Sequence, residues 1–423
     1  MVRKTGESSA TAEDGRWLRS VVICGGGNAG HALAVVLSQH FDGPVDWLVG
    51  SSDKAALIAE NHRRVGLEST GVILGSADRL RTISADPSTV VPDADLVLLA
   101  VPAFCHAAVL ERIAPHVRRG AAVGCLPTRG GFEFDAGRLG DGLTIFGLQT
   151  LPWSTRVTSL GETVNFGAAK STVVLASLPT SAATALAETM ERLLGVTVVP
   201  ADSILNLTLG NPGQFIHPGL MFGHFHAWDG EEYREESIPR FYAQATEEMG
   251  DVVARLSAEA IEVAREIEYV SEAALDLRRV VPVLEWLHAS YSHVTEDTAT
   301  VGSCFRTGPI QARLAPVSEV RPGVFTPNFA YRYLTEDVPY GLVVTRAIAE
   351  LAGVETPTLD AVITWAQAAM GREYLRSGCV DGRDAELLPI PQNHGIHTLE
   401  DLLAWYDAES SQPAARRERL VVD

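Results

Sequence analysis

The stretch VVICGGGNAGHAL, residues 21–33, decides the fold. A short apolar run meets a glycine turn, and the turn opens a helical pattern. Gly25 permits a tight turn, Gly27 leaves room for a pyrophosphate beside the backbone, and Gly30 lets the helix and the strand approach closely, as G-x-G-x-x-G requires. The helix N-terminus also offers free N–H groups to phosphates. The residues predicted here to bind a dinucleotide are Gly25, Gly27, Asn28, Ala29 and Gly30.

Short apolar runs, the first of which leads into this turn, alternate with helical patterns up to about residue 178. They are Val21–Cys24, Val45–Val49, Leu96–Val101, Ala121–Leu126, Leu143–Leu148 and Thr172–Ala176. Strands that are apolar on both faces belong in a buried parallel sheet, and residues 31–40 have the spacing of a crossover helix. The sequence therefore predicts an α/β N-terminal Rossmann domain with a parallel, doubly wound sheet.

The sequence pattern changes from Ser181 onward, where long helical patterns replace the short apolar runs. They cover Ser181–Leu194, Phe241–Glu268, Val281–Ser290, Tyr340–Leu351 and Leu359–Leu375. A chain of 423 residues suits two domains. We predict a polar, disordered leader at residues 1–18, the Rossmann domain at 19–190 and a mostly α-helical domain at 191–423, with the boundary near 178–202.

Charge and hydropathy exclude several classes of protein. A net charge of −19 argues against binding to nucleic acids and to anionic membranes. The longest apolar runs fall far short of the ~20 residues of a membrane span. Residues 1–18 lack the apolar core of a signal peptide, so we expect a cytoplasmic protein. The five cysteines form no C-x-x-C pair, so neither a disulfide framework nor a thiolate metal site is indicated.

Two further strand ends point at the predicted cofactor site. An acidic residue at the end of the second strand favours NADH, whereas hydroxyl and cationic side chains favour the 2′-phosphate of NADPH. Ser51, Ser52, Asp53 and Lys54 offer both, so NADH and NADPH stay open. After the Leu96–Val101 run, Val101, Pro102 and Ala103 are predicted to line the nicotinamide ribose; the alternative is an ordinary loop proline.

Three segments combine titratable and aromatic residues in apolar surroundings: residues 149–156 (QTLPWSTR), 211–223 (NPGQFIHPGLMFG) and 331–339 (YRYLTEDVP). With the GGGN-x-x-H turn and the VPAF run at 101–104, they resemble the octopine dehydrogenase group of the opine dehydrogenases. The RYLTEDVP run at 332–339 is the most specific, and the resemblance covers about residues 21–403. It implies a Rossmann domain, a helical domain and the reduction, with NAD(P)H, of an imine formed from an amino acid and a 2-oxo acid.

The resemblance also implies roles for particular residues. The family's general acid/base falls on His217, its carboxylate partner on Asp337, and an arginine that grips a substrate carboxylate on Arg332. The chemistry agrees, because imine reduction needs a proton on nitrogen, and histidine holds and releases protons near neutral pH. A carboxylate against the other ring nitrogen would fix the tautomer, and guanidinium groups bind carboxylates bidentately. Thr150 is predicted to contact a substrate and Trp286 to line the amino-acid pocket; the alternative for Trp286, with Tyr291 on the same helical stretch, is a place in the core.

The loop at residues 126–134 departs from the octopine-forming members. Arg129 stands where they carry an uncharged amide that helps to hold the oxo acid. A charged fork there is predicted to grip a further carboxylate, which argues against octopine as the product and against pyruvate as the only oxo acid.

Other interpretations stay open. His217 could be a core histidine, Arg332 and Asp337 a structural ion pair, and His224-Phe225-His226 with Asp229 a metal cluster on a strand. Hydroxy-acid dehydrogenases with a helical domain commonly use a lysine from that domain, and no lysine follows Lys170 here. A non-catalytic NAD(P)-binding regulator is the remaining rival.

Overall fold

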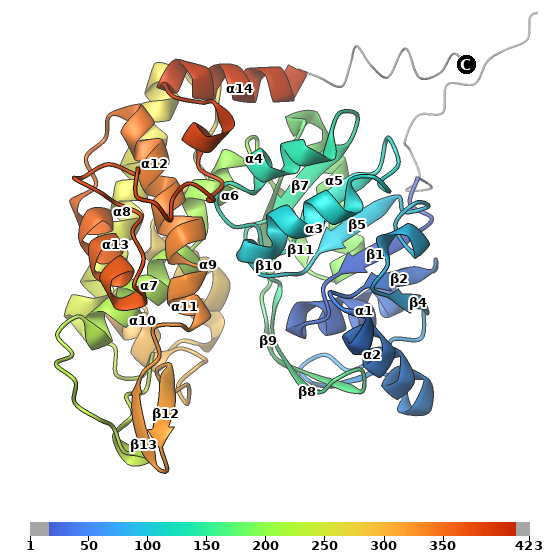
Figure 1. Cartoon of the computed structure of the whole chain (residues 1–423), viewed down its shortest axis with the longest axis horizontal. Helices are drawn as coiled ribbons and strands as arrows, with labels where there is room; N and C mark the ends of the chain where they lie inside the picture. Colours follow the sequence, from blue (N-terminus) through green and yellow to red (C-terminus); the bar gives the residue numbers. More distant parts are fainter. Residues whose placement is uncertain (1–16, 412–423) are drawn as a thin grey trace, which may run out of the picture.

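A twisted eight-stranded sheet forms the core of the N-terminal half (Figure 1). The computed structural model describes residues 17–411, so most of the predicted leader lies outside the described residues. The strand order is β11-β10-β7-β6-β5-β1-β2-β4. The strands are β1 (Val21–Cys24), β2 (Val45–Leu48), β4 (Leu80–Ser84), β5 (Leu96–Leu99), β6 (Ala122–Cys125), β7 (Thr144–Leu148), β10 (Thr172–Leu178) and β11 (Thr197–Pro200).

All six predicted apolar runs form strands of this sheet, but one of them runs the opposite way. β10 is antiparallel to β7, whereas we predicted a wholly parallel sheet. The reason is an inserted hairpin, β8 (Trp153–Ser159) and β9 (Thr163–Ala169). The hairpin carries the chain out from the end of β7 and back to that same end, so the next strand must run in reverse. β3 (Glu68–Gly71) extends the hairpin into a small sheet.

Helices cover both faces of the large sheet, as a doubly wound fold requires. α1 (Asn28–His40), α2 (Ser52–Val65) and α5 (Ala183–Leu194) supply the apolar side chains of one core. α3 (His106–Ile113) and α4 (Phe132–Ala136) supply those of the other. The central strands β1, β2, β5 and β6 are buried along their whole length, which agrees with their largely apolar sequence.

The C-terminal half is mostly helical, so the predicted fold class is confirmed. It contains α6 (Leu205–Gly210), α7 (Gly213–Phe225), α8 (Glu247–Val270), α9 (Val283–Tyr291), α10 (Val301–Thr307), α11 (Arg332–Thr335), α12 (Val343–Ala352), α13 (Pro357–Met370) and α14 (Leu399–Ser411), with a small hairpin of β12 (Val317–Arg321) and β13 (Val324–Pro327). α7, α12 and α13 pack around the long α8 and share one apolar core. No helix within residues 17–411 combines the length and apolar character that a membrane crossing needs.

Several predicted helix bounds were wrong for local reasons. The helix predicted from Phe241 begins at Glu247, because Thr246 caps it by accepting the Met249 N–H. The helix predicted from Tyr340 starts as a π-helical turn, Val338–Leu342, and becomes α-helical only at Val343. β11 lies beyond the boundary predicted at residue 190, so we propose that the sheet-containing domain extends to Pro200.

Candidate active site

The glycine turn between β1 and α1 leaves open space where a ligand would lie. Gly25 has a φ of +129°, and a Cβ there would lie 2.4 Å from the carbonyl oxygen of Ala100. A Cβ on Gly30 would lie 1.8 Å from the carbonyl oxygen of Gly25. A Cβ on Gly27, by contrast, would meet no atom of residues 17–411 within 4 Å. The N-terminus of α1 therefore borders free space, which fits the diphosphate of a dinucleotide.

Two side chains of α1 fasten the β8–β9 hairpin beside this turn. Asn28 Oδ1 accepts the Val157 N–H at 2.9 Å, and His31 Nε2 accepts the Gly161 N–H at 2.9 Å. His31 Nδ1 lies 2.8 Å from the Gly27 carbonyl oxygen. Burial lowers the pKa of His31 to about 4, so the neutral ring donates from one nitrogen and accepts at the other. The histidine of the GGGN-x-x-H motif thus positions the hairpin.

The residues after β2 lie beside the same turn. Ser51 caps α2 by accepting the Lys54 N–H at 3.4 Å. Ser52 and Asp53 are exposed in the first turn of this helix. Lys54 leans toward the glycine turn, since its Cε lies 3.3 Å from the position of a Cβ on Gly26. This arrangement offers a carboxylate for a ribose hydroxyl and cationic and hydroxyl groups for a 2′-phosphate, so both NADH and NADPH fit.

The end of β5 reaches the helical half. The Ala103 N–H donates to Oε1 of Glu336 at 3.1 Å, and Ala103 is buried. Val101 and Pro102 are only partly buried at the same strand end. The contact of Val101 and Pro102 with a nicotinamide ribose therefore stays a prediction, whereas the Ala103 N–H already has a partner.

Gly27→Val is expected to abolish NADH and NADPH binding without unfolding the protein, because the new side chain would fill only the open space above the turn. Gly30→Ala is the matched control: its methyl group would overlap the Gly25 carbonyl oxygen, so we expect a lower thermal midpoint. Fluorescence titration with each cofactor and thermal unfolding would measure the two effects. Undiminished affinity in Gly27→Val would remove this turn from the cofactor site.

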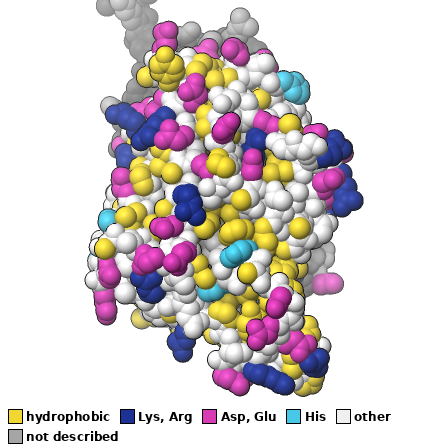
Figure 2. All heavy atoms as spheres, turned by 90° about the vertical axis from the view of Figure 1, so that its left-hand side faces the viewer, with side chains coloured by type: hydrophobic (Ala, Val, Ile, Leu, Met, Phe, Trp, Pro, Cys, Tyr) yellow, Lys and Arg dark blue, Asp and Glu magenta, His cyan; other side chains and the backbone are white. Residues whose placement is uncertain are grey.

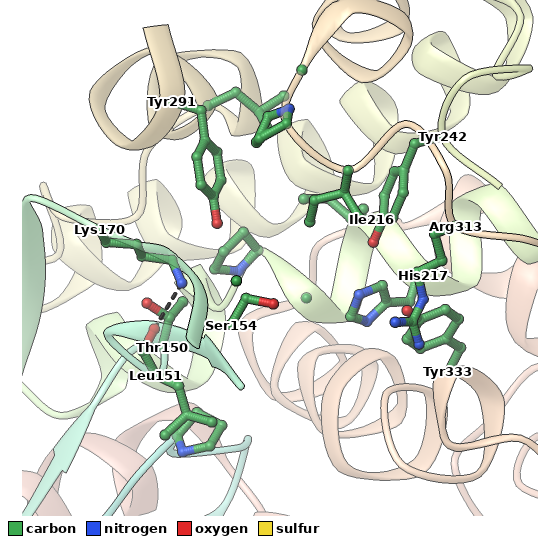
Figure 3. Close-up of a pocket in the computed structure, with 18 of the residues that line it drawn as sticks. Thr150, Leu151, Ser154, Lys170, Ile216, His217, Tyr242, Tyr291, Arg313 and Tyr333 are labelled. Atoms are coloured by element: carbon green, nitrogen blue, oxygen red, sulfur yellow. Dashed lines mark hydrogen bonds between the residues drawn. The ribbon is translucent and has the colours of Figure 1, made fainter. Parts of the chain in front are cut away.

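His217 and Asp337, far apart in sequence, lie in direct contact. His217 projects from the second turn of α7, and its Nδ1 lies 2.8 Å from Oδ2 of Asp337. Asp337 is fully buried at the start of the π-helical turn, and Tyr333 stacks on the imidazole with ring centroids 3.9 Å apart. The carboxylate and the stacked ring fix the imidazole, and they leave Nε2 as the nitrogen available to the cavity that His217 lines (Figure 3).

Asp337 belongs to a cluster of two buried carboxylates and two guanidinium groups, of which Arg129 is buried and Arg332 is half exposed. Arg129 Nη1 lies 2.9 Å from Oδ1 of Asp337, and its Nε lies 3.8 Å from Oε1 of Glu336. Arg129 Nη1 also donates to Oδ1 of Asn211 at 2.9 Å. Arg332 Nη2 lies 2.6 Å from Oε2 of Glu336. The cluster is electrically balanced, as charges removed from water must be.

Neighbouring cations keep Asp337 ionised. Burial by itself favours the protonated carboxyl, but the Arg129 guanidinium, His217 and Arg332 outweigh it and lower the pKa of Asp337 below its ordinary value. The carboxylate can therefore accept the His217 Nδ1 proton throughout the neutral pH range.

The cluster bears on both arginines that were predicted to bind substrate carboxylates, and both line the cavity. Arg129 was predicted to grip a substrate carboxylate, but its side chain is only 7% exposed and already faces two carboxylates of the protein. The proposed Arg332–Asp337 ion pair does not form, since Arg332 pairs with Glu336. Half of the Arg332 side chain stays exposed, and it lines the cavity, so its predicted role as a carboxylate-binding residue is compatible with the structure.

A cavity of about 580 Å³ connects these parts. It is bounded by the start of α1, the β8–β9 hairpin, α7, α9, α10 and α11. Asn28 lines one part of it and His217 another, and Thr150 and Trp286 are among the remaining lining residues. Asn28 of the predicted cofactor site, the predicted acid/base and the predicted substrate contacts therefore share one space.

Sequence reasoning missed several residues of this cavity. Lys170, Tyr242 and Arg313 all line it, and Figure 3 shows Lys170 on the opposite side from His217. The only available signal for Lys170 was the scarcity of lysine, of which the chain has just three: Lys4, Lys54 and Lys170. Arg313 follows no motif, and its place depends on tertiary packing.

His224 and His226 lie at the end of α7, not on a strand. His224 Nε2 lies 2.9 Å from the carbonyl oxygen of Phe241, and His226 Nδ1 lies 2.8 Å from that of Phe222. Each ring is thus committed to a backbone carbonyl, which disfavours the metal-cluster interpretation.

Comparison with known proteins agrees with this geometry. The family model for the α-helical domain of NAD/NADP octopine/nopaline dehydrogenases matches residues 200–370. The octopine dehydrogenase of Pecten maximus is 32% identical over 397 residues, which cover 90% of this chain and 98% of that protein. The opine dehydrogenase of Haliotis discus hannai is 30% identical over 401 residues, covering 91% and 98%. A solved structure of octopine dehydrogenase with NADH and L-arginine has a TM-score of 0.82 and 29% identity, covering 92% and 98%.

Proposed function

The chain belongs to the opine dehydrogenase family, and we propose that it joins an amino acid to a 2-oxo acid and reduces their imine beside His217. It is an NAD(P)-dependent oxidoreductase that acts on CH–NH bonds. The observation that carries the proposal is a single cavity lined both by Asn28, the first residue after the glycine turn, and by the oriented imidazole of His217. Such a cavity can hold a cofactor and two small substrates together.

The cofactor would rest against the N-terminus of α1, with Ser51 and Lys54 beside its adenosine end and Val101 and Pro102 beside its nicotinamide ribose. When bound, it supplies the hydride that reduces the imine carbon. The chain's own residues must then provide a proton for nitrogen, bind the substrate carboxylates and keep water from the imine.

His217 is the proton carrier in this proposal. In the direction of synthesis its protonated Nε2 donates a proton to the substrate nitrogen as the carbon accepts hydride. In the reverse direction the neutral ring accepts that proton. Asp337 is a positioning residue, because it touches the imidazole and not the substrate. Arg332 is the candidate for one substrate carboxylate, since its side chain is partly exposed at the cavity.

The test is an assay for NAD(P)H oxidation that omits each substrate in turn. We expect oxidation only when an amino acid and a 2-oxo acid are both present, and a product whose mass equals the two substrates less one water plus two hydrogens. Oxidation with the oxo acid alone would indicate a hydroxy-acid dehydrogenase, and none with any pair would indicate a non-catalytic binding protein. Either result would overturn the proposal.

A further inference from the structure

The cavity is cationic although the protein is acidic. The chain has a net charge of −19, and Asp and Glu side chains are scattered over the outer face of the helical half (Figure 2). Yet none of the cavity's lining residues within the described range 17–411 is an aspartate or a glutamate, while five are cationic: Arg129, Arg156, Lys170, Arg313 and Arg332. A cavity of this character selects for anionic ligands.

Three of these cations are accounted for by ion pairs within the protein or by a position near the predicted cofactor phosphates. Arg129 and Arg332 are balanced by Asp337 and Glu336. Arg156 belongs to β8, and the next residue on that strand donates its N–H to Asn28 at the glycine turn. Arg156 therefore lies at the end of the cavity that would hold the cofactor phosphates. Lys170 and Arg313 remain.

Lys170 is held in the cavity wall without a counter-ion. It follows β9, and its Nζ donates to the Leu151 carbonyl oxygen at 2.7 Å and lies 5.9 Å from the centroid of the Tyr291 ring. No carboxylate of residues 17–411 forms an ion pair with it. Burial lowers the pKa of Lys170 to about 8, so the ammonium still carries its proton at neutral pH. Only one of its three N–H donors has a partner among the described contacts.

Arg313 lies on the opposite side of the cavity, close to the imidazole. Its Nη2 donates to the Tyr331 hydroxyl at 2.8 Å, and its guanidinium lies 5.5 Å from the centroid of Tyr333, the ring that stacks on His217 (Figure 3). A carboxylate next to the reacting nitrogen can therefore reach Arg313 or Arg332, but the Lys170 ammonium lies across the cavity.

We propose that Lys170 binds an anionic group on the side chain of the amino-acid substrate, so that this enzyme uses acidic amino acids and rejects cationic ones. The inference rests on the proposed function. The product of the reaction carries two α-carboxylates near the secondary amine, and Arg332 and Arg313 lie where they can bind them. Lys170 is a third cation, and its charge matches a third anionic group. A guanidinium or ammonium side chain there would face Lys170 with no carboxylate lining the described cavity to offset the repulsion.

The experiment compares L-glutamate, L-glutamine and L-arginine in wild type and Lys170→Met, with NADH or NADPH and a panel of 2-oxo acids. Glutamate and glutamine differ mainly in charge. We expect wild type to prefer glutamate over glutamine in kcat/KM, and Lys170→Met to lose about 10–100-fold with glutamate and little with glutamine, as for a buried charged hydrogen bond. Calorimetric titration of the enzyme–cofactor complex with glutamate should show the same loss.

Two further variants make the comparison sharper. Lys170→Gln keeps a donor for the Leu151 carbonyl, so it serves if the methionine variant does not fold. Arg265→Met removes an exposed cation of α8 that does not line the cavity, and it should leave the glutamate preference unchanged.

The outcomes separate this inference from the proposed function. If the enzyme turns over amino acids but prefers glutamine or arginine to glutamate, the inference fails and the proposed function stands. If Lys170→Met and Lys170→Gln impair glutamate and glutamine equally, Lys170 binds an α-carboxylate or serves the reaction generally, and the inference again fails. If none of these three amino acids is turned over but another amino acid is, the inference fails alone; if no amino acid is turned over with any 2-oxo acid, the proposed function falls and this inference with it.

Discussion

His217→Ala is expected to lower kcat by ~10²–10⁴-fold in both directions, the usual effect of losing a general acid or base. The two ring nitrogens of the imidazole have distinct environments, since Nδ1 faces Asp337 and Nε2 is left to the cavity. Cofactor affinity should change little, because His217 lies on α7, away from the glycine turn. Steady-state kinetics with an identified substrate pair and a titration with cofactor would measure both.

The matched control for this variant is His226→Ala. His226 caps the same helix, is exposed and does not line the cavity, so its loss should leave kcat near wild type. Near-wild-type turnover in His217→Ala would end the assignment, and the proton would then have to come from Tyr333, Tyr242 or water.

The pH profile distinguishes proton transfer from a merely structural role of His217. Synthesis requires the protonated ring and oxidation the neutral one, so the optimum for synthesis should lie at the lower pH. Asp337→Asn keeps the shape of the side chain but loses the charge. We expect it to cost less than His217→Ala and to shift both profiles, since Asp337 acts on substrate only through the imidazole. Unshifted profiles in Asp337→Asn would contradict this positioning role.

The large sheet could be predicted from the sequence because its central strands are continuous apolar runs. The spacing of the glycines after the first run also matches a dinucleotide-binding turn. Sequence reasoning missed β8 and β9, which alternate buried and exposed residues and contain Ser, Thr and Arg in place of an apolar run. Since those strands were missed, the reversal of β10 could not be foreseen. The direction of a strand depends on where the preceding connection leaves the chain, and local composition does not record that.

The candidate site divides in the same way. His217, Asp337 and Arg332 could be named because they occur in distinctive motifs. The partners of Arg129 could not be predicted, because only tertiary packing brings them to it. Asn211 lies just before α7 and Glu336 just after α11. The sequence placed a guanidinium beside the substrates, but only the packing shows that it faces the protein's own carboxylates. Lys170 was missed for the same reason, since a lone lysine after an unpredicted strand has no local signature.

Arg129→Met is expected to destabilise the protein by about 3 kcal/mol or more, because it leaves Asp337 and Glu336 buried beside only His217 and Arg332. Arg265→Met is the control. Arg265 and its partner Glu262 are both exposed, so its loss should cost no more than about 1 kcal/mol. Denaturant unfolding of both variants at neutral pH would measure the difference.

The pH dependence of this effect follows from Asp337. In wild type its lowered pKa means that its contribution to stability is present above the unfolded value of about 3.9 and is lost as the pH falls below it. Without Arg129 the effect of burial is less opposed, so the folded carboxyl binds a proton more readily and the variant regains stability as the pH falls. The gap between wild type and Arg129→Met should therefore be smaller near pH ~5 than near pH ~8. A gap that widens in acid would contradict the ion pair.

Arg129→Gln tests whether Arg129 determines which 2-oxo acid the enzyme prefers. If Arg129 gripped the oxo acid, an uncharged amide would change which oxo acid is preferred. If it holds Asp337 and Glu336 instead, as the 2.9 Å contact with Asp337 indicates, kcat should fall by a similar factor with every oxo acid and their ranking should stay the same. Initial rates with pyruvate, 2-oxobutyrate and 2-oxoglutarate would decide between the two. A selective gain with pyruvate would restore Arg129 to the substrate contacts and would require it to leave Asp337 in the bound state.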